Sequence, residues 1–230
     1  MIYNNIVEGI FLKRLNRFVA LVKIKGHVQR VHVKNTGRLK ELLVEGVECF
    51  LQEHDSKNRK TKYSLIGVKK GDRIVNIDSQ ASNKVFREAI DQGLILPGLE
   101  GPIIHTRPEA SFADSRLDFY LETGKDKAYV ELKGVTLELG GVAKFPDAPT
   151  IRGVKHIRDL IRARALGYKA FVVFIVQMEG VEYFSPNDEM HAEFGQALRE
   201  ASELGVRVLA YGCELGPDSL LLGRQLAVKL

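Results

Sequence analysis

The chain changes character near residue 82, and this change limits the folds open to it. Before that point, short runs of β-branched and apolar residues alternate with basic ones, as in "RFVALVKIKG" and "HVQRVHVKN". After it, strand-like runs alternate with amphipathic helical segments. Alternation with period 2 predicts half-buried strands, whereas an amphipathic helix repeats its apolar face every 3.6 residues. We therefore expect two domains, residues 1–82 and 83–230.

The two parts also differ in charge. Residues 1–82 contain 16 Lys and Arg against 8 Asp and Glu, whereas residues 83–230 contain 18 against 21. A basic first part favours a polyanionic partner such as a nucleic acid. Cys49 and Cys213 lie far apart and the first residues lack a signal-peptide pattern, so we expect a cytoplasmic protein with reduced thiols.

The first part is expected to form a small barrel. A second pair of strand-like runs lies in "KYSLIGVKKGDRIVNID" around a turn at Gly71, and "GRLKELL" is expected to form a short helix. Short strands with one helix are typical of an OB-like β-barrel, which binds nucleic-acid strands through basic side chains and stacked aromatic rings. The candidates are Arg14, Arg17, Lys34, Arg38, Arg59 and Lys60, with Phe18 and Tyr63 as aromatic neighbours. The alternative for Phe18 is a place in the core.

The second part has the pattern of an α/β sandwich. Asn83 is expected to cap a helix that ends at Gly93, and Thr150 a helix that ends at Gly167. A third helix is expected in "NDEMHAEFGQALREASELG", and "VRVLAYGCEL" is expected to be the last strand. The apolar run "AFVVFIV" is too short to cross a membrane and is expected to be a buried strand.

Two carboxylates and a lysine interrupt the strand-like runs "SRLDFYLE" and "KAYVELKG". Alternate residues of a strand share a face, which places Glu131 and Lys133 together. If the two strands pair antiparallel, Asp118 stands beside Glu131. Adjacent carboxylates repel each other unless a proton or a cation lies between them, and Mg²⁺ prefers oxygen ligands. The pattern predicts a metal site, and the alternative is a solvent-facing hairpin.

The spacing of these three residues resembles the core of PD-(D/E)xK phosphodiesterases. The longer words "FPDAPTIRGVKH", "NTGRLKELL", "NRF", "SRLDF" and "ELKGVTL" together resemble the sugar fermentation stimulation protein A family over nearly the whole chain. The resemblance implies an N-terminal OB-like domain and a C-terminal PD-(D/E)xK restriction-endonuclease-like domain. It also implies DNA binding with little sequence preference and a regulatory link to sugar (maltose) metabolism. The family often has a glycine before its Ser-Arg pair, where this chain has "SFADSR", which leaves the geometry of that loop open.

The resemblance places catalytic roles on Asp118, Glu131 and Lys133. We expect Mg²⁺ or Mn²⁺ to be held by Asp118, Glu131 and the Leu132 carbonyl, while Lys133 assists the attacking water. A further acid could come from Glu109, which resembles a family glutamate, or from Glu88; the alternative for each is an exposed surface carboxylate. The phosphate-contact candidates in this part are Arg116, Arg152, Lys155 and His156, the last three on the first turns of an expected helix. The alternative is a solvated basic face, and His156 is also a candidate general acid.

Two functions therefore remain open from the sequence. One is a DNA-binding protein with a divalent-metal-dependent nuclease site. The other is a non-catalytic, sequence-non-specific DNA-binding regulator. A sugar-cleaving enzyme is disfavoured because the chain has no Trp and no pattern of paired carboxylates with aromatic platforms.

Overall fold

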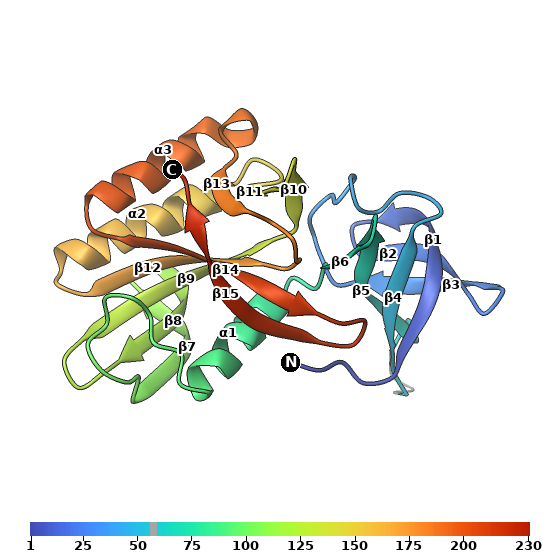
Figure 1. Cartoon of the computed structure of the whole chain (residues 1–230), viewed down its shortest axis with the longest axis horizontal. Helices are drawn as coiled ribbons and strands as arrows, with labels where there is room; N and C mark the ends of the chain where they lie inside the picture. The colour runs from blue at the N-terminus through green and yellow to red at the C-terminus, as the bar shows by residue number, and fades with distance from the viewer. Residues whose placement is uncertain (56–58) are drawn as a thin grey trace.

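The computed structural model describes residues 1–55 and 59–230, which form two units side by side (Figure 1). The first unit contains β1 (Ile6–Asn16), β2 (Val19–Ile24), β3 (His27–Val33), β4 (Glu48–Glu53), β5 (Tyr63–Lys70) and β6 (Arg73–Asn76). The second contains α1 (Ala81–Asp91), β7 (His105–Phe112), β8 (Ser115–Glu122), β9 (Lys127–Val135), β10 (Leu137–Leu139), β11 (Val142–Phe145), α2 (Ile151–Ala165), β12 (Lys169–Val176), β13 (Tyr183–Pro186), α3 (Asp188–Glu203), β14 (Arg207–Leu215) and β15 (Leu220–Val228).

Pairing among the first five strands closes the first unit into a barrel. β1 pairs antiparallel with β2 and β4, β2 with β3, and β4 with β5, and a parallel pairing of β3 with β5 completes the circuit. The apolar half of each alternating run points inward, where Phe11, Val22, Val31, Leu51 and Leu65 are buried. The predicted OB-like barrel is confirmed, as is the β5–β6 hairpin, which turns at Gly71 with φ +61°.

The short helix expected in "GRLKELL" is wrong, because this segment forms a single turn. Leu39 has a φ of 49°, outside the right-handed helical region. Its carbonyl accepts from the N–H groups of Leu42 and Leu43, at 3.1 and 2.8 Å. Leu39 and Leu42 are both buried in the barrel core, so packing against the barrel overrides the helical propensity of the segment.

The second unit is a nine-stranded sheet with helices on both faces, which confirms the expected α/β sandwich. The strand order is β10-β11-β13-β15-β14-β12-β9-β8-β7. The buried faces of α2 and α3 pack with one side of the central strands, and α1 packs with the other side (Figure 1). The run "AFVVFIV" lies in β12, where its residues are buried between the parallel neighbours β9 and β14. Among the described residues, no helix combines the length and apolarity needed to cross a membrane.

The helix caps and the number of strands agree only in part with the sequence predictions. The Thr150 cap is confirmed, because its Oγ1 accepts from the Gly153 N–H at 3.0 Å. The Asn83 cap is wrong, because α1 begins two residues earlier and Asn83 lies in its first turn. The strand expected to be last, β14, is followed by β15, which pairs antiparallel with it. The sequence patterns described above also do not predict β1, β4, β7 or β13.

The two units meet along a bonded junction. Val75 bridges Met178, and the Asn76 N–H donates to the Gln177 carbonyl at 2.9 Å. Lys70 reaches across to the carboxylate of Glu138 at 2.7 Å. These contacts connect the barrel to the end of β12 and to the β10–β11 hairpin.

Candidate functional site

Asp118 and Glu131 come together on adjacent strands. β8 and β9 pair antiparallel from Phe119 opposite Val130 to Glu122 opposite Lys127, which confirms the expected pairing; Asp118 directly precedes the paired segment, and the charge of Glu131 acts on it. Val130 and Leu132 point into the core beside α1, so Glu131 and Lys133 point to the opposite face, toward α2. Glu131 and Lys133 therefore share one face of β9, as the alternation predicted, whereas the Asp118 carboxylate contacts Asn83 of α1, which packs with the other side of the sheet.

Asp118 is held by two neutral donors. Asn83 Nδ2 donates to Oδ1 at 2.9 Å, and the Leu132 N–H donates to Oδ2 at 2.7 Å. Burial and then the negative charge of Glu131 raise the pKa of Asp118, and these two hydrogen bonds only partly oppose the increase. The local pattern predicts a helix cap at Asn83, whereas its contact with Asp118 depends on the packing of α1 against the sheet.

Glu131 is almost fully buried, with 3% of its surface exposed. Lys133 Nζ donates to Oε1 at 2.5 Å, and His156 Nδ1 contacts the same oxygen. Burial alone would raise the pKa of Glu131, but the His156 hydrogen bond and Lys133 outweigh burial and lower it. Glu131 is therefore ionised near neutral pH. Its Oε2 is buried and has no hydrogen-bond partner among the residues that the structure describes.

His156 orients Glu131 from α2. Arg152 Nε donates to His156 Nε2 at 3.3 Å, so Nε2 acts as the acceptor and Nδ1 carries the hydrogen that faces Glu131. His156 is buried, with 5% exposed, whereas the sequence grouped it with surface cations. Arg152 and His156 are four residues apart and so share one face of the helix. This spacing is the one sequence signal that could have suggested their hydrogen bond.

The other candidate acids lie elsewhere. Glu109 is exposed and lies 3.9 Å from Arg116, which is also exposed. Glu88 is half-exposed and pairs with the Met1 amine at 2.6 Å.

The phosphate-contact candidate Lys155 is exposed. Its Nζ donates to Ser115 Oγ at 2.6 Å and lies 3.2 Å from Asp114.

The donor set of the carboxylate pair fits a hard divalent cation. Asp118, Glu131 and the Leu132 carbonyl supply oxygen atoms, which Mg²⁺, Mn²⁺ and Ca²⁺ prefer. The partnerless Oε2 of Glu131 and the raised pKa of Asp118 both indicate negative charge that protein donors leave partly uncompensated. No group of three or more His, Cys, Asp or Glu side chains within residues 1–55 and 59–230 is arranged to hold a metal. Water and substrate oxygens would have to complete the coordination.

Among the barrel cations, Arg14 is already fully engaged. Its five N–H groups donate to backbone carbonyls on two loops: Asn16 (3.2 Å) and Arg17 (2.6 Å) in the β1–β2 turn, and Asn35 (2.7 Å), Gly37 (2.5 Å) and Arg38 (2.9 Å) after β3. A guanidinium has only five N–H groups, so Arg14 positions these loops.

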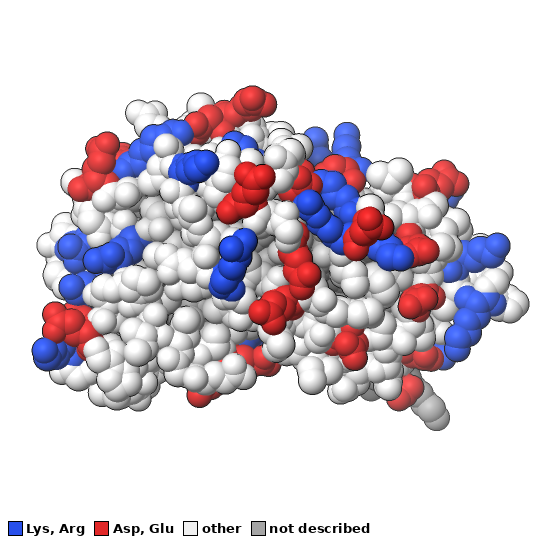
Figure 2. Space-filling model, in the orientation of Figure 1, with Lys and Arg blue, Asp and Glu red and all other residues white. Residues whose placement is uncertain are grey.

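The remaining barrel cations differ in their surroundings. Lys34 forms an ion pair with buried Asp78. Arg17, Arg38, Arg59 and Lys60 are exposed. The core alternative for Phe18 is wrong, because 52% of its surface is exposed. On the face in Figure 2, Lys and Arg are interspersed with Asp and Glu, and no continuous basic strip runs across it.

Comparisons with known proteins cover both units. Residues 80–219 match the family described as "Sugar fermentation stimulation protein RE domain", and residues 12–77 match "SfsA N-terminal OB domain". The chain is 54% identical to the "Sugar fermentation stimulation protein homolog" of Desulfitobacterium hafniense (strain DSM 10664 / DCB-2), over 100% of this chain and 99% of the relative. It is 51% identical to the homolog of Clostridium beijerinckii, over 96% of each chain.

A solved structure shows the same architecture. It is described as Pyrococcus furiosus SfsA in complex with Ca²⁺, and it superposes with a TM-score of 0.89 at 35% sequence identity. The match covers 100% of this chain and 98% of that protein.

Proposed function

Because this chain belongs to the sugar fermentation stimulation protein family, we propose that it binds DNA and hydrolyses phosphodiester bonds with a divalent cation. The observation that carries the proposal is Glu131, a buried and ionised carboxylate with one partnerless oxygen. Its charge acts on the neighbouring Asp118, and its Oε1 accepts from Lys133, two residues later on the same face of β9. The family's OB domain and the basic first part of the chain support binding to a polyanion.

Asp118, Glu131 and the Leu132 carbonyl would hold Mg²⁺ or Mn²⁺. The complex of the Pyrococcus furiosus relative with Ca²⁺, another cation that takes oxygen ligands, supports this assignment. When bound, such a cation polarises a phosphoryl oxygen and lowers the pKa of a bound water.

The protein side chains divide the remaining work. Arg152 fixes the ring of His156, and His156 fixes Glu131. Asn83 and the Leu132 N–H fix Asp118. Lys133 is the nearest cation to the pair, and its Nζ can donate to an attacking water or to a phosphate oxygen. The general-acid role considered for His156 is disfavoured, because both ring nitrogens already have partners.

Cleavage of labelled DNA tests the proposal. Wild-type protein should cut DNA in Mg²⁺ or Mn²⁺, Glu131→Gln should reduce the rate by at least about 100-fold, and Lys133→Met should reduce it by a smaller factor. Lys69→Met, on the outer barrel where Lys69 pairs with Glu48, is the matched control and should retain full activity. Equal rates in all four proteins would mean that a contaminating nuclease does the cutting.

The second candidate is a non-catalytic DNA-binding regulator of sugar (maltose) metabolism. One observation favours it: Lys133 and His156 both donate to Glu131, so protein groups already compensate part of its charge. In this case wild type and Glu131→Gln would bind DNA equally, with strong dependence on salt, and neither would cut it with any divalent ion.

A further inference from the structure

Two hollows lie on either side of the loop that follows β3. The barrel-end pocket has a volume of about 430 Å³ and is lined by Phe18, His32, His54, Arg59 and Lys34 among others. The junction pocket has a volume of about 230 Å³ and is lined on the second unit by Gly134, Thr136, Lys144 and Asp147 among others. Asn35, Thr36 and Ser79 line both pockets. These three residues, which we call the wall, therefore lie between the two hollows.

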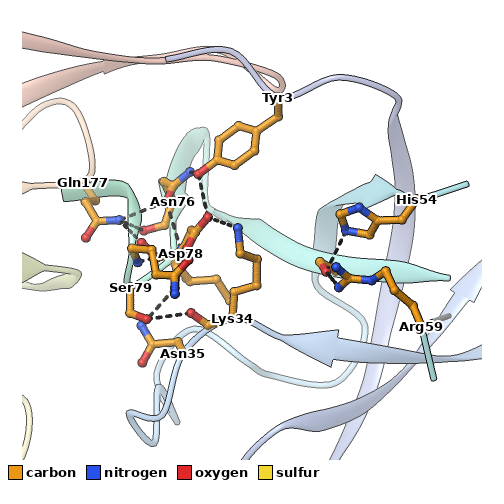
Figure 3. Close-up of polar contacts among 12 residues, drawn as sticks. Tyr3, Lys34, Asn35, His54, Arg59, Asn76, Asp78, Ser79 and Gln177 are labelled. Carbon is orange, nitrogen blue, oxygen red and sulfur yellow. Dashed lines mark hydrogen bonds and ion pairs between the residues drawn. The ribbon is translucent and has the colours of Figure 1, made fainter. Parts of the chain in front are cut away.

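The barrel-end pocket has the chemistry of a phosphate site. None of its described lining residues is acidic. Arg59 Nη2 and His54 Nε2 contact Ser64 Oγ at 3.0 and 2.9 Å (Figure 3). The two barrel-end histidines, His32 and His54, have pKa values lowered by burial and then by Arg59 and Lys34. An entering phosphate would therefore meet an excess of positive charge.

The carboxylates near this pocket compensate Lys34 but leave Arg59. Asp78 is buried in an ion pair with Lys34, and its charge also opposes the lowering of the His32 pKa. Asp55 acts on His54 and is the smallest of the influences on its pKa. The guanidinium of Arg59, on an exposed side chain, is thus available to a phosphate.

Phe18 supplies an aromatic platform at the same pocket. It lies in the turn between β1 and β2, where its N–H donates to Asn16 Oδ1 at 2.9 Å and its carbonyl accepts from the Val33 N–H at 2.9 Å. The backbone is fixed by these bonds while about half of the residue is exposed. An exposed ring beside cations is how OB-folds stack the bases of a single strand. Bases in a duplex are stacked on each other and cannot use such a platform.

The wall and the junction are held rigidly. Arg14 bonds both the turn that carries Phe18 and the loop that carries Asn35, as described above. Asn35 Nδ2 donates to the Ile77 carbonyl at 2.9 Å, and Ser79 Oγ donates to the Lys34 carbonyl at 2.9 Å. The two pockets therefore have a fixed relation to each other.

Asp78 ties this region to the second unit (Figure 3). Its carboxylate accepts from Tyr3 and Lys34, and its carbonyl accepts from Gln177 Nε2 at 3.1 Å. Gln177 also donates to Asn76 Oδ1 at 2.9 Å. The junction pocket is thus bounded by bonded elements of both units.

The junction pocket adjoins β9, the strand that carries Glu131. Gly134 lines it and follows Lys133 directly on β9. Gly134 is three positions after Glu131, which is about 10 Å along a strand.

We propose that a single strand of nucleic acid stacks a base on Phe18, places a phosphate beside Arg59, crosses the wall at Thr36 and passes through the junction pocket toward Glu131. This inference rests on the proposed function, because the candidate site gives the path its destination. It restricts the substrate class to single strands or to the unpaired ends of duplexes.

Binding without turnover tests the first half of the path. Fluorescence anisotropy in EDTA would compare a labelled oligothymidylate, an oligouridylate and the duplex of oligothymidylate with oligoadenylate. Phe18→Ala should weaken single-strand binding by about 10-fold and leave duplex binding unchanged. Arg59→Gln should reduce the slope of log K against log salt by about 0.7. Lys69→Gln, an exposed cation elsewhere on the barrel, should do neither. The proposal would be overturned if Phe18→Ala and Arg59→Gln both bound the single strand as tightly as wild type does. It would also be overturned if Phe18→Ala weakened duplex binding as much as single-strand binding.

The crossing needs its own variant. Thr36 is exposed and lines both pockets, so Thr36→Trp should obstruct passage without removing a buried contact. It should weaken the binding of a long oligothymidylate at least about 10-fold more than the binding of the dinucleotide pTpT. Equal weakening of both probes would refute a path across the wall.

The two proposals fail separately. Glu131→Gln should retain single-strand binding in EDTA even though it loses cleavage. If wild-type protein never cuts DNA but Phe18→Ala and Thr36→Trp behave as expected, the path stands and the nuclease proposal falls. If cleavage requires Glu131 but is unchanged in Phe18→Ala and Thr36→Trp, the nuclease proposal stands and the path falls.

Discussion

Replacement of Arg14 by lysine distinguishes a loop-positioning role from a phosphate contact. Lysine keeps the positive charge but offers one nitrogen in place of a five-donor fork. Two of the five bonds, to the carbonyls of Asn35 and Gly37, are partly buried, and three are exposed. A hydrogen bond from a charged donor contributes about 1.5–3 kcal/mol, and the two partly buried bonds come from different guanidinium nitrogens, so we expect the single nitrogen of lysine to keep one of them. We therefore expect Arg14→Lys to destabilise the barrel by about 1.5–3 kcal/mol, while the exposed carbonyls return to water.

Urea unfolding monitored by circular dichroism would measure this loss, with Arg17→Lys as the matched control on an exposed side chain. Hydrogen exchange would localise it, because the amides of Leu42 and Leu43 donate to Leu39 in the loop that follows β3. These amides should exchange faster in Arg14→Lys than in the control. The reasoning is refuted if both lysine variants unfold at the same urea concentration and Arg14→Ala weakens only DNA binding.

Three further predictions concern the two units and their junction. Asn83→Ala removes a bond that lowers the pKa of Asp118, so the acidic limb of the cleavage rate should move to higher pH, or cation binding by calorimetry should need higher pH; an unchanged pH profile would contradict this. Single-strand affinity should increase as pH falls, because a bound phosphate favours protonation of the barrel-end histidines, whose pKa values are lowered in the free protein; titration of the affinity from pH 8 to pH 5 checks the sign. Gly134→Ala places a Cβ 2.4 Å from Gln177 Oε1 and should cost about 1–3 kcal/mol in thermal unfolding; the same substitution should cost less when it is made in a Gln177→Ala background.

The carboxylate pair was predictable because it depends on local rules. Period-2 alternation places Glu131 and Lys133 on one face of β9, and a short loop between two strand-like runs favours an antiparallel pair. Register then brings Asp118 close enough for the charge of Glu131 to act on it. The barrel and the sandwich were predictable for the same reason, since alternating runs and capped helical stripes each indicate their own element.

The groups that orient this pair were missed because their partners are distant in sequence. Asn83 lies 35 residues from Asp118, and His156 lies 25 residues from Glu131. Local patterns offered each of them a nearer role, as a cap and as a surface cation. The burial of Phe18 and Leu39 was also not predictable from local patterns. Phe18 is exposed and Leu39 is buried because of how the closed barrel packs around them.

The state of Glu131 connects the fold to both proposed functions. A carboxylate with only a structural role would be expected to have both oxygens paired, because a buried acceptor without a partner costs about 1–3 kcal/mol. Here Lys133 and His156 both donate to Oε1, and Oε2 has no partner among the described residues. The charge of Glu131 also raises the pKa of Asp118, so the pair carries negative charge that its protein donors do not fully neutralise. A divalent cation would relieve both effects at once, whether or not cleavage follows. Cation binding to wild type and Glu131→Gln is therefore the measurement that should come before any assay of turnover.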